Sequence, residues 1–176
     1  MITATDVQGK PRPYGGQAHL YDFEYLNYTD DIPFYLNRLG EHHLRGPLLE
    51  LGTGTGRVAI PLAEAGFQVV GIDLSVPMLR RARRRRHVLP AEVARRLRFA
   101  RMDMTSFSFR ERFDAVLIPF SALAMLQEPE QRRACLERSA AHLPSGGLLW
   151  IDLFAPSLLE PPAGGAPVHY QSTFCL

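Results

Sequence analysis

The sequence is poor in cysteine and has no long apolar run. Of its two cysteines, Cys135 falls in a helical pattern and Cys175 is the penultimate residue, so no disulfide framework is indicated and a reducing compartment fits best. No apolar run approaches the ~18 to 20 residues that a membrane span requires. Residues 1–10 also lack the basic and apolar regions of a secretory signal. We therefore expect a cytoplasmic protein without a membrane partner.

The net positive charge of the chain depends on one segment. Six arginines lie within residues 80–86, and without them the net charge of +2 becomes −4. A dedicated nucleic-acid binder carries a broader basic face. Consecutive helical positions also point in several directions, so the run predicts a solvated helix end and disfavours a nucleic-acid partner. The six residues are Arg80, Arg81, Arg83, Arg84, Arg85 and Arg86.

The length of 176 residues has room for one domain, because compact domains take roughly 100 to 200 residues. With 46% apolar and 22% charged residues, the chain can bury a sizeable core. Residues 1–17 are polar and interrupted by prolines and glycines, so we expect a mobile N-terminal arm there. The predicted domain is 18–154. The rest, 155–176, is expected to be an irregular tail in which 169–174 is the one plausible further strand.

Strand and helix patterns alternate along the domain. This alternation predicts an α/β fold with a doubly wound, Rossmann-like parallel sheet and helices on both faces. Ligands of such sheets bind at the carboxyl ends of the strands. The expected strands are 48–51, 67–72, 97–102, 114–120 and 148–154, and the expected helices are 31–44, 57–65, one from Ser75 through the arginines, and 130–143.

A glycine turn follows the first expected strand. Gly52, Gly54 and Gly56 have no Cβ atoms, so the backbone there can approach a ligand closely. Asp73 ends the second strand, 21 residues after Gly52, where a carboxylate can accept both hydroxyls of a ribose. The dinucleotide pattern G-x-G-x-x-G would need glycine in place of Arg57. A nucleoside-containing ligand is therefore predicted.

An acidic residue, Glu50, stands two positions before Gly52. Its carboxylate would repel a pyrophosphate and attract an ammonium group, so the electrostatics favour a zwitterionic or cationic nucleoside. S-adenosylmethionine has an α-ammonium, a sulfonium and a ribose. Glu50 and Arg57 both argue against the alternative of a nucleotide- or NAD-dependent protein.

Several segments together resemble the class I S-adenosylmethionine-dependent methyltransferases. The match begins with Leu-Leu-Glu-Leu-Gly-Thr-Gly-Thr-Gly-Arg and extends to Leu-Pro-Ser-Gly-Gly before the fifth strand. The matching segments are residues 48–57, 71–75, 77–79, 101–104, 113–118 and 143–147, within about 21–154. The resemblance implies S-adenosylmethionine as the cofactor and methyl transfer as the activity.

The resemblance also implies roles for individual residues. Glu50 would lie near the ammonium, Asp73 would bind the ribose, and Leu74 would pack on the adenine. Asp103 would accept from the adenine amino group, although an acid at this position could instead cap a turn. Arg57 could meet the ligand carboxylate, but the first residue of a helix is more often solvated. The complete expected set of cofactor-binding residues is Tyr21, Glu50, Gly52, Thr53, Gly54, Gly56, Asp73, Leu74, Met78, Asp103, Met104 and Ile118.

The methyl acceptor is predicted to be a small molecule, methylated on nitrogen or oxygen. Residues 118–121 read Ile-Pro-Phe-Ser and lack the Asn-Pro-Pro-aromatic tetrad that resembling enzymes use on planar amino nitrogens. The aromatic segment 21–28 is expected to cover the site. No catalytic base can be named and no metal is predicted. The alternative function is a non-catalytic S-adenosylmethionine-binding or assembly module.

Resembling proteins have a sixth and a seventh strand, the seventh antiparallel. Only 22 residues follow Phe154, and prolines and glycines interrupt them. We therefore expect a sheet that lacks the last one or two strands, and an incomplete substrate-binding part. The exposed sheet edge would favour pairing with a second copy in a homodimer.

Overall fold

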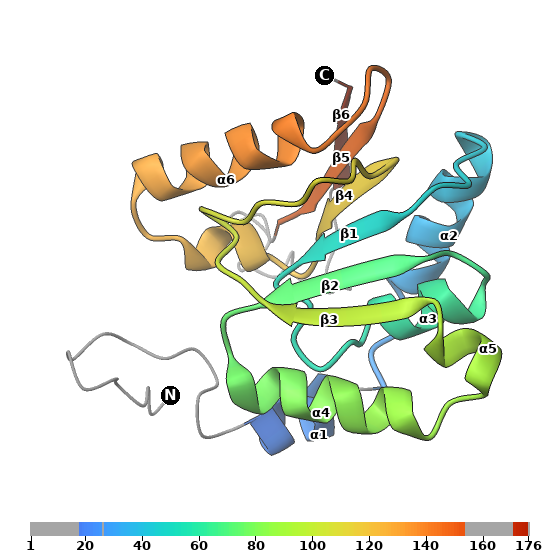
Figure 1. Cartoon of the computed structure of the whole chain (residues 1–176). Helices are drawn as coiled ribbons and strands as arrows, with labels where there is room; N and C mark the ends of the chain where they lie inside the picture. Colours follow the sequence, from blue (N-terminus) through green and yellow to red (C-terminus); the bar gives the residue numbers. More distant parts are fainter. Residues whose placement is uncertain (1–17, 26, 154–170, 176) are drawn as a thin grey trace, which may run out of the picture.

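The structure is a computed structural model, and it describes residues 18–25, 27–153 and 171–175. The expected N-terminal arm, and residues 155–170 of the expected tail, lie outside these residues. Within them a single six-stranded sheet has the order β3-β2-β1-β4-β5-β6 (Figure 1). The strands are β1 Leu48–Leu51, β2 Val69–Asp73, β3 Leu97–Arg101, β4 Ala115–Ile118, β5 Leu148–Asp152 and β6 Gln171–Cys175.

The first five strands are parallel, and β6 pairs antiparallel with β5. The predicted Rossmann-like parallel sheet is thus confirmed, with fewer strands than the seven of the resembling family. β6 overlaps the segment 169–174 that the sequence offered as a further strand. The strand order reverses direction between β1 and β4, and ligands of open α/β sheets bind outside the carboxyl ends of the strands at such a point.

Helices cover both faces of the sheet (Figure 1). Asp31 precedes α2, Pro33 lies in its first turn, and Ser75 accepts a hydrogen bond from the Met78 amide at the start of α4. Helix α3 begins at Ala59, so Arg57 lies in the preceding turns and not in the helix predicted for 57–65. The helices are α1 Ala18–Tyr25, α2 Ile32–Glu41, α3 Ala59–Glu64, α4 Val76–His87, α5 Ala91–Ala94, the 3₁₀ helix η1 Ala122–Met125, and α6 Pro129–Ala141.

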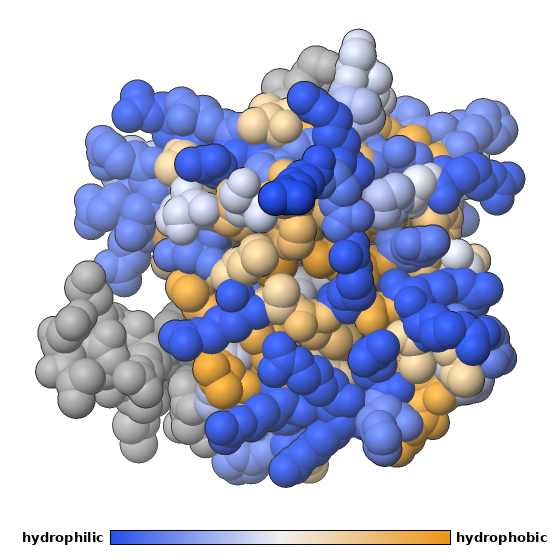
Figure 2. Space-filling model, in the orientation of Figure 1, coloured by the Kyte–Doolittle hydropathy of each residue, from blue (hydrophilic) through white to orange (hydrophobic). Residues whose placement is uncertain are grey.

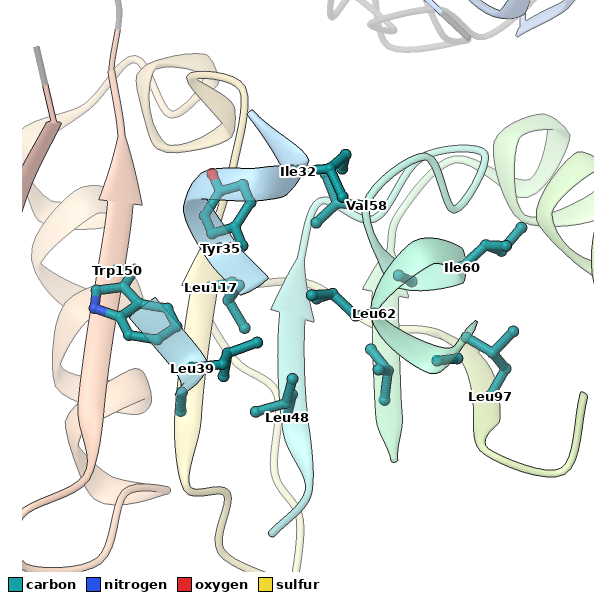
Figure 3. Close-up of a cluster of buried hydrophobic side chains, with 14 of the residues drawn as sticks. Ile32, Tyr35, Leu39, Leu48, Val58, Ile60, Leu62, Leu97, Leu117 and Trp150 are labelled. Atoms are coloured by element: carbon teal, nitrogen blue, oxygen red, sulfur yellow. The ribbon is translucent and has the colours of Figure 1, made fainter. Parts of the chain in front are cut away.

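Two apolar cores sandwich the sheet. On one face, Tyr35 and Leu39 of α2 and Leu62 of α3 belong to the same buried cluster as Leu117 of β4 and Trp150 of β5 (Figure 3). On the other face, the side chains of η1 and α6 pack against alternate residues of the same strands. Each large apolar side chain that is fully buried stabilises the fold by roughly 1.5 to 3 kcal/mol. Burial on both faces explains why β4 is a continuous apolar run, whereas the edge strand β3 carries exposed arginines.

The prediction of a solvated helix end holds for Arg80, Arg83 and Arg84, which are exposed, but not for Arg81, Arg85 and Arg86, which are half-buried. Arg81 forms an ion pair with Asp22 of α1, and Arg85 Nη1 donates to the Thr55 carbonyl oxygen at 3.1 Å. Arg83 Nη2 donates to Phe99 O at 3.1 Å, and Arg86 Nε donates to Ala94 O at 2.8 Å. Hydrophilic side chains dominate the surface over α4 (Figure 2). The run thus connects α4 to four other segments, a use that consecutive arginines permit because they point in several directions.

In the part of the chain that the structure describes, no helix combines the length and apolar composition needed to cross a membrane.

Candidate cofactor and acceptor site

The glycine turn after β1 has an unusual backbone. Gly52, Gly54 and Gly56 have φ angles of +73°, +57° and +78°, in the left-handed region that favours glycine. The amides of Gly52 and Thr53 both donate to the Ile72 carbonyl oxygen, at 2.9 and 3.0 Å, which fixes the turn to the end of β2. A Cβ at Gly54 would meet only the Gly52 carbonyl oxygen, at 3.9 Å. The turn therefore leaves room for a ligand over Gly54.

Asp73 faces this turn from the end of β2. Its Oδ2 accepts a hydrogen bond from the Gly54 amide at 2.8 Å, and its Oδ1 accepts one from the Ser75 amide at 2.7 Å. These donors, with a weaker contribution from the Leu74 amide, orient the carboxylate, which keeps capacity for a further donor such as a ribose hydroxyl. Burial raises the pKa of Asp73, against the lowering effect of the backbone donors. Beside it, the apolar side chain of Leu74 is 54% exposed and can cover a flat ring.

Glu50 lies buried beneath the turn and is 1% exposed. Its Oε2 accepts a hydrogen bond from the Thr53 hydroxyl at 2.9 Å. Burial raises the pKa of Glu50 to about 8, so the carboxyl group is mainly protonated at neutral pH. An ammonium group bound beside it would favour the ionised form. Glu50 can therefore serve as a buried acceptor for a cationic group, and binding of such a group would release a proton.

Gly71 makes the contact between Thr53 and Glu50 possible. A Cβ at position 71 would lie 2.5 Å from Thr53 Oγ1 and 2.8 Å from Thr53 Cβ. Only glycine in the middle of β2 thus leaves space for the Thr53 side chain to turn back to Glu50. The Thr53 hydroxyl is thus engaged by Glu50 within the turn.

Arg57 is a functional candidate that the sequence analysis misplaced. It is 4% exposed, and its two Nη atoms each donate to one carboxylate oxygen of Asp31 at 2.7 Å. Burial acts to lower the pKa of Arg57, but the bonds to Asp31 outweigh it and raise the pKa. The expected solvated position is wrong because Asp31, read from the sequence as a helix cap, binds the guanidinium. No local pattern joins two residues 26 positions apart.

An aromatic cluster lies beside Arg57. The rings of Tyr21, Tyr25 and Tyr28 contact the ring of Phe120, with centroids 6.4, 5.1 and 5.7 Å apart. The Arg57 guanidinium carbon is 4.8 Å from the centroid of the Phe120 ring, a cation–π distance. The segment predicted to cover the site therefore packs on the residues that follow β4.

The Tyr35 hydroxyl of α2 points toward the carboxyl ends of the strands (Figure 3). It is buried and has no hydrogen-bond partner among the described residues. Burial raises its pKa, and the nearby carboxyl groups of Asp152, Asp31 and Glu50 raise it further. The hydroxyl is thus neutral at physiological pH and can donate to a ligand or a water.

Other predicted site residues have contacts of their own. Asp103 Oδ1 accepts from the amide and the hydroxyl of Thr105, both at 2.7 Å, so the turn-capping alternative is present in the structure. The Ile118 side chain is 0% exposed in the core on the α6 face. Met78 is buried in α4. A Cβ at Gly52 would lie 3.8 Å from Met104 Cε, which places Met104 beside the glycine turn.

Gly56 differs from the other two glycines of the turn. A Cβ there would lie 3.1 Å from Phe99 Cζ and 3.4 Å from Ile60 Cδ1. Gly56 therefore permits close packing of the turn on β3, whereas Gly54 leaves open space for a ligand.

Residues 48–147 match the family model described as a methyltransferase domain. The chain belongs to this family. The predicted resemblance to class I S-adenosylmethionine-dependent methyltransferases is confirmed, because solved methyltransferases share the fold. The glycopeptide N-methyltransferase MtfA, in a crystal structure with S-adenosylmethionine, aligns with a TM-score of 0.70 at 27% identity over 84% of this chain and 68% of MtfA. The CcbJ methyltransferase from Streptomyces caelestis gives a TM-score of 0.75 at 25% identity, over 85% of this chain and 60% of CcbJ.

Curated relatives include the cypemycin N-terminal methyltransferase of a Streptomyces species, 32% identical over 119 residues. The dTDP-3-amino-3,6-dideoxy-alpha-D-glucopyranose N,N-dimethyltransferase of Streptomyces fradiae is 31% identical over 160 residues. These matches cover 68% and 86% of this chain, but 46% and 59% of the relatives. The chain therefore spans about half the length of the curated relatives that it matches.

Proposed function

We propose that this chain binds S-adenosylmethionine and forms the cofactor-binding part of an enzyme that methylates an amine nitrogen of a small molecule. The observation that carries the proposal is the Asp73 carboxylate, which the Gly54 and Ser75 amides orient beside the open side of the glycine turn. Oriented charged acceptors bind ribose hydroxyls strongly. The fold family supports the same ligand, since MtfA was crystallised with S-adenosylmethionine and with S-adenosylhomocysteine.

The roles of the remaining residues follow from their positions. Glu50 would accept a hydrogen bond from the ammonium, and exposed Leu74 would cover one face of the adenine. Asp103 and Met104 would meet the adenine edge, with one Asp103 oxygen already engaged by Thr105. These assignments are proposals that binding measurements on single variants can test.

An amine acceptor is supported by the names of the relatives. The cypemycin enzyme is described as an N-terminal methyltransferase, and the Streptomyces fradiae enzyme as an N,N-dimethyltransferase of an amino sugar nucleotide. Besides burial, the carboxyl groups of Asp30 and Asp152 raise the pKa of Tyr28 in the aromatic cluster, so negative charge lies near enough to attract an amine as it enters. A nucleic-acid acceptor is disfavoured because the arginines of α4 connect parts of the fold.

S-adenosylmethionine, when bound, supplies a methyl group on a positively charged sulfur. The residues of the chain would orient the reactants and exclude water. The glycine turn and Asp73 would orient the cofactor, and the aromatic cluster would exclude water from the acceptor. An amine must present a free lone pair in line with the methyl group, so the acceptor has to bind in its neutral form or lose a proton in the site.

Titration calorimetry with S-adenosylhomocysteine tests the cofactor. We expect binding well below millimolar concentration and no comparable binding of NAD. Absence of S-adenosylhomocysteine binding in that range would sink the proposal. Methyl transfer is then followed by mass spectrometry with amino sugars, free amino acids and short peptides, each compared with its hydroxyl analogue. Methylated hydroxyl analogues alone would exclude the amine. Binding with no methylated product would favour the non-catalytic binding module.

A further inference from the structure

Two consecutive residues after β4 have a strained backbone. Phe120 and Ser121 have φ angles of +53° and +56°. Residues other than glycine rarely adopt this left-handed backbone region, and neither position is a glycine. Such strain persists only where the surrounding structure holds it, and it concentrates at ligand sites.

The residue that holds this turn is Asp152, the last residue of β5. Its Oδ2 accepts a hydrogen bond from the Phe120 amide at 3.1 Å, and its carbonyl oxygen accepts one from the Ser121 amide at 3.0 Å. The last register pair between β4 and β5 is Ile118 with Ile151. The bonds to Asp152 therefore lie beyond the regular ladder.

The turn connects the two halves of the candidate site. On one side, the Phe120 ring contacts Tyr21, Tyr25 and Tyr28 and lies over Arg57. On the other side, a Cβ at Gly52 would lie 2.8 Å from Ala122 Cβ, so Ala122, which directly follows the strained pair, borders the glycine turn. An extended backbone at 120 and 121 would carry the ring away from both.

We propose that Asp152 is a positioning residue: it holds Phe120 and Ser121 in the left-handed conformation and so fixes the aromatic ring between the glycine turn and the aromatic cluster. This inference rests on the proposed function for its ligand, S-adenosylmethionine, and adds a residue that the sequence analysis did not single out. Asp152 acts through the backbone of the turn and not by contact with the ligand.

The inference predicts a rescue. Asp152→Ala should weaken S-adenosylhomocysteine binding about tenfold, because the turn loses roughly one hydrogen bond that holds it in the binding conformation. Adding Ser121→Gly should restore most of the affinity, because glycine adopts a positive φ without a Cβ penalty. Asp152→Asn keeps a side-chain acceptor and should bind like the unchanged chain.

Asp114→Ala is the matched control. Asp114 also accepts a backbone hydrogen bond, from the Gly46 amide at 2.6 Å, but it precedes β4 at the opposite end of the strand. This variant should lower stability to urea without changing S-adenosylhomocysteine affinity. If Asp152→Ala also lowered stability without changing affinity, Asp152 would have only a structural role and the inference would be wrong. Failure of Ser121→Gly to restore binding would also overturn it. An Asp152→Asn variant as weak as Asp152→Ala would show that charge, and not the held turn, matters.

A second readout needs no ligand. In hydrogen exchange measured by NMR, the Phe120 amide should be protected in the unchanged chain and in Asp114→Ala, and should lose protection in Asp152→Ala, which removes its acceptor. Equal protection in all three would overturn the inference even if the chain bound no S-adenosylhomocysteine. If Asp152→Ala does not fold, the double variant with Ser121→Gly and the Asp152→Asn variant provide the same comparison.

Discussion

The carboxylate of Asp31 and the guanidinium of Arg57 meet through two hydrogen bonds of 2.7 Å, with both side chains 4% exposed. Arg57 directly follows the last glycine of the turn, and Asp31 directly precedes α2. The pair therefore fixes the start of α2 to the glycine turn. Arg57 Nη1 also donates to the Tyr28 carbonyl oxygen at 2.8 Å, which extends the connection to the aromatic cluster.

Breaking this pair should be costly. Asp31→Ala leaves a buried guanidinium without its partner, and we expect the free energy of unfolding in urea to fall by about 3 to 5 kcal/mol. Arg38→Ala is the control, because the Arg38–Glu41 pair has side chains 44% and 58% exposed. Its loss should change stability by no more than about 1 kcal/mol. Similar effects of both variants would contradict the structural role given to Asp31.

Asp73→Ala should reduce the affinity for S-adenosylhomocysteine. It removes the acceptor proposed for the ribose and frees the Gly54 and Ser75 amides, at an expected cost of roughly 1 to 3 kcal/mol in binding free energy. Titration calorimetry measures the change, with Glu111→Ala as a control at an exposed acid paired with Arg98. An unchanged affinity in Asp73→Ala would remove Asp73 from the ribose site.

Glu50 should make both stability and binding depend on pH. Burial raises its pKa from an ordinary value of 4.5 to about 8, so the folded state holds a proton that the unfolded state has lost between these values. The stabilising contribution is therefore full below about pH 4.5 and declines as pH rises toward 8. Urea unfolding across this range should show a weaker pH dependence in Glu50→Gln.

Binding should have the opposite dependence. An ammonium group beside Glu50 favours the ionised carboxylate, so S-adenosylhomocysteine affinity should increase from pH 6 to about pH 8, where the group ionises unaided. Calorimetry in buffers of different ionisation enthalpy should detect a released proton at pH 6.5. No proton release would contradict the position proposed for the ammonium.

Gly71→Ala should destabilise the glycine turn by crowding Thr53. The added Cβ would crowd Thr53 Oγ1 at 2.5 Å, and overpacking of this kind costs about 1 to 3 kcal/mol of stability. Thr53→Gly removes the crowding atoms, so the double variant should lose less stability than the two single changes predict together. Gly40→Ala in α2 is the control, because a Cβ there would have nothing within 4 Å. Equal effects at 40 and 71 would contradict the argument.

The parts of the fold that the sequence predicted are those encoded locally. The apolar runs of β1, β2 and β4 and the glycines after β1 each lie within a few adjacent residues, and Asp73 follows from the end of its own strand. Parallel strands buried on both faces are continuous apolar runs, so their positions can be read without knowledge of their neighbours. The short elements α5 and η1, at four residues each, leave too little pattern to predict.

The contacts that complete the site are not local. Arg57 depends on Asp31, and the turn at Phe120 depends on Asp152, which is 32 positions away. A positive φ at Phe120 or Ser121 has no signal in the sequence, since glycine is the residue that normally marks it. The contacts of Arg83, Arg85 and Arg86 in α4 could not be predicted for a similar reason, because their partners are backbone carbonyl groups, and every residue type has one.

Strand β3 is one edge of the sheet, and the charged side chains along it affect whether a second chain can pair there. Arg98 and Glu111 form an exposed ion pair there, Arg101 is exposed, and Arg83 donates to the Phe99 carbonyl oxygen. A strand added at this edge would have to compete with these charges, which is how natural edge strands resist aggregation. We therefore expect β3 to protect the protein from fibril-like stacking, and expect any homodimer to form elsewhere.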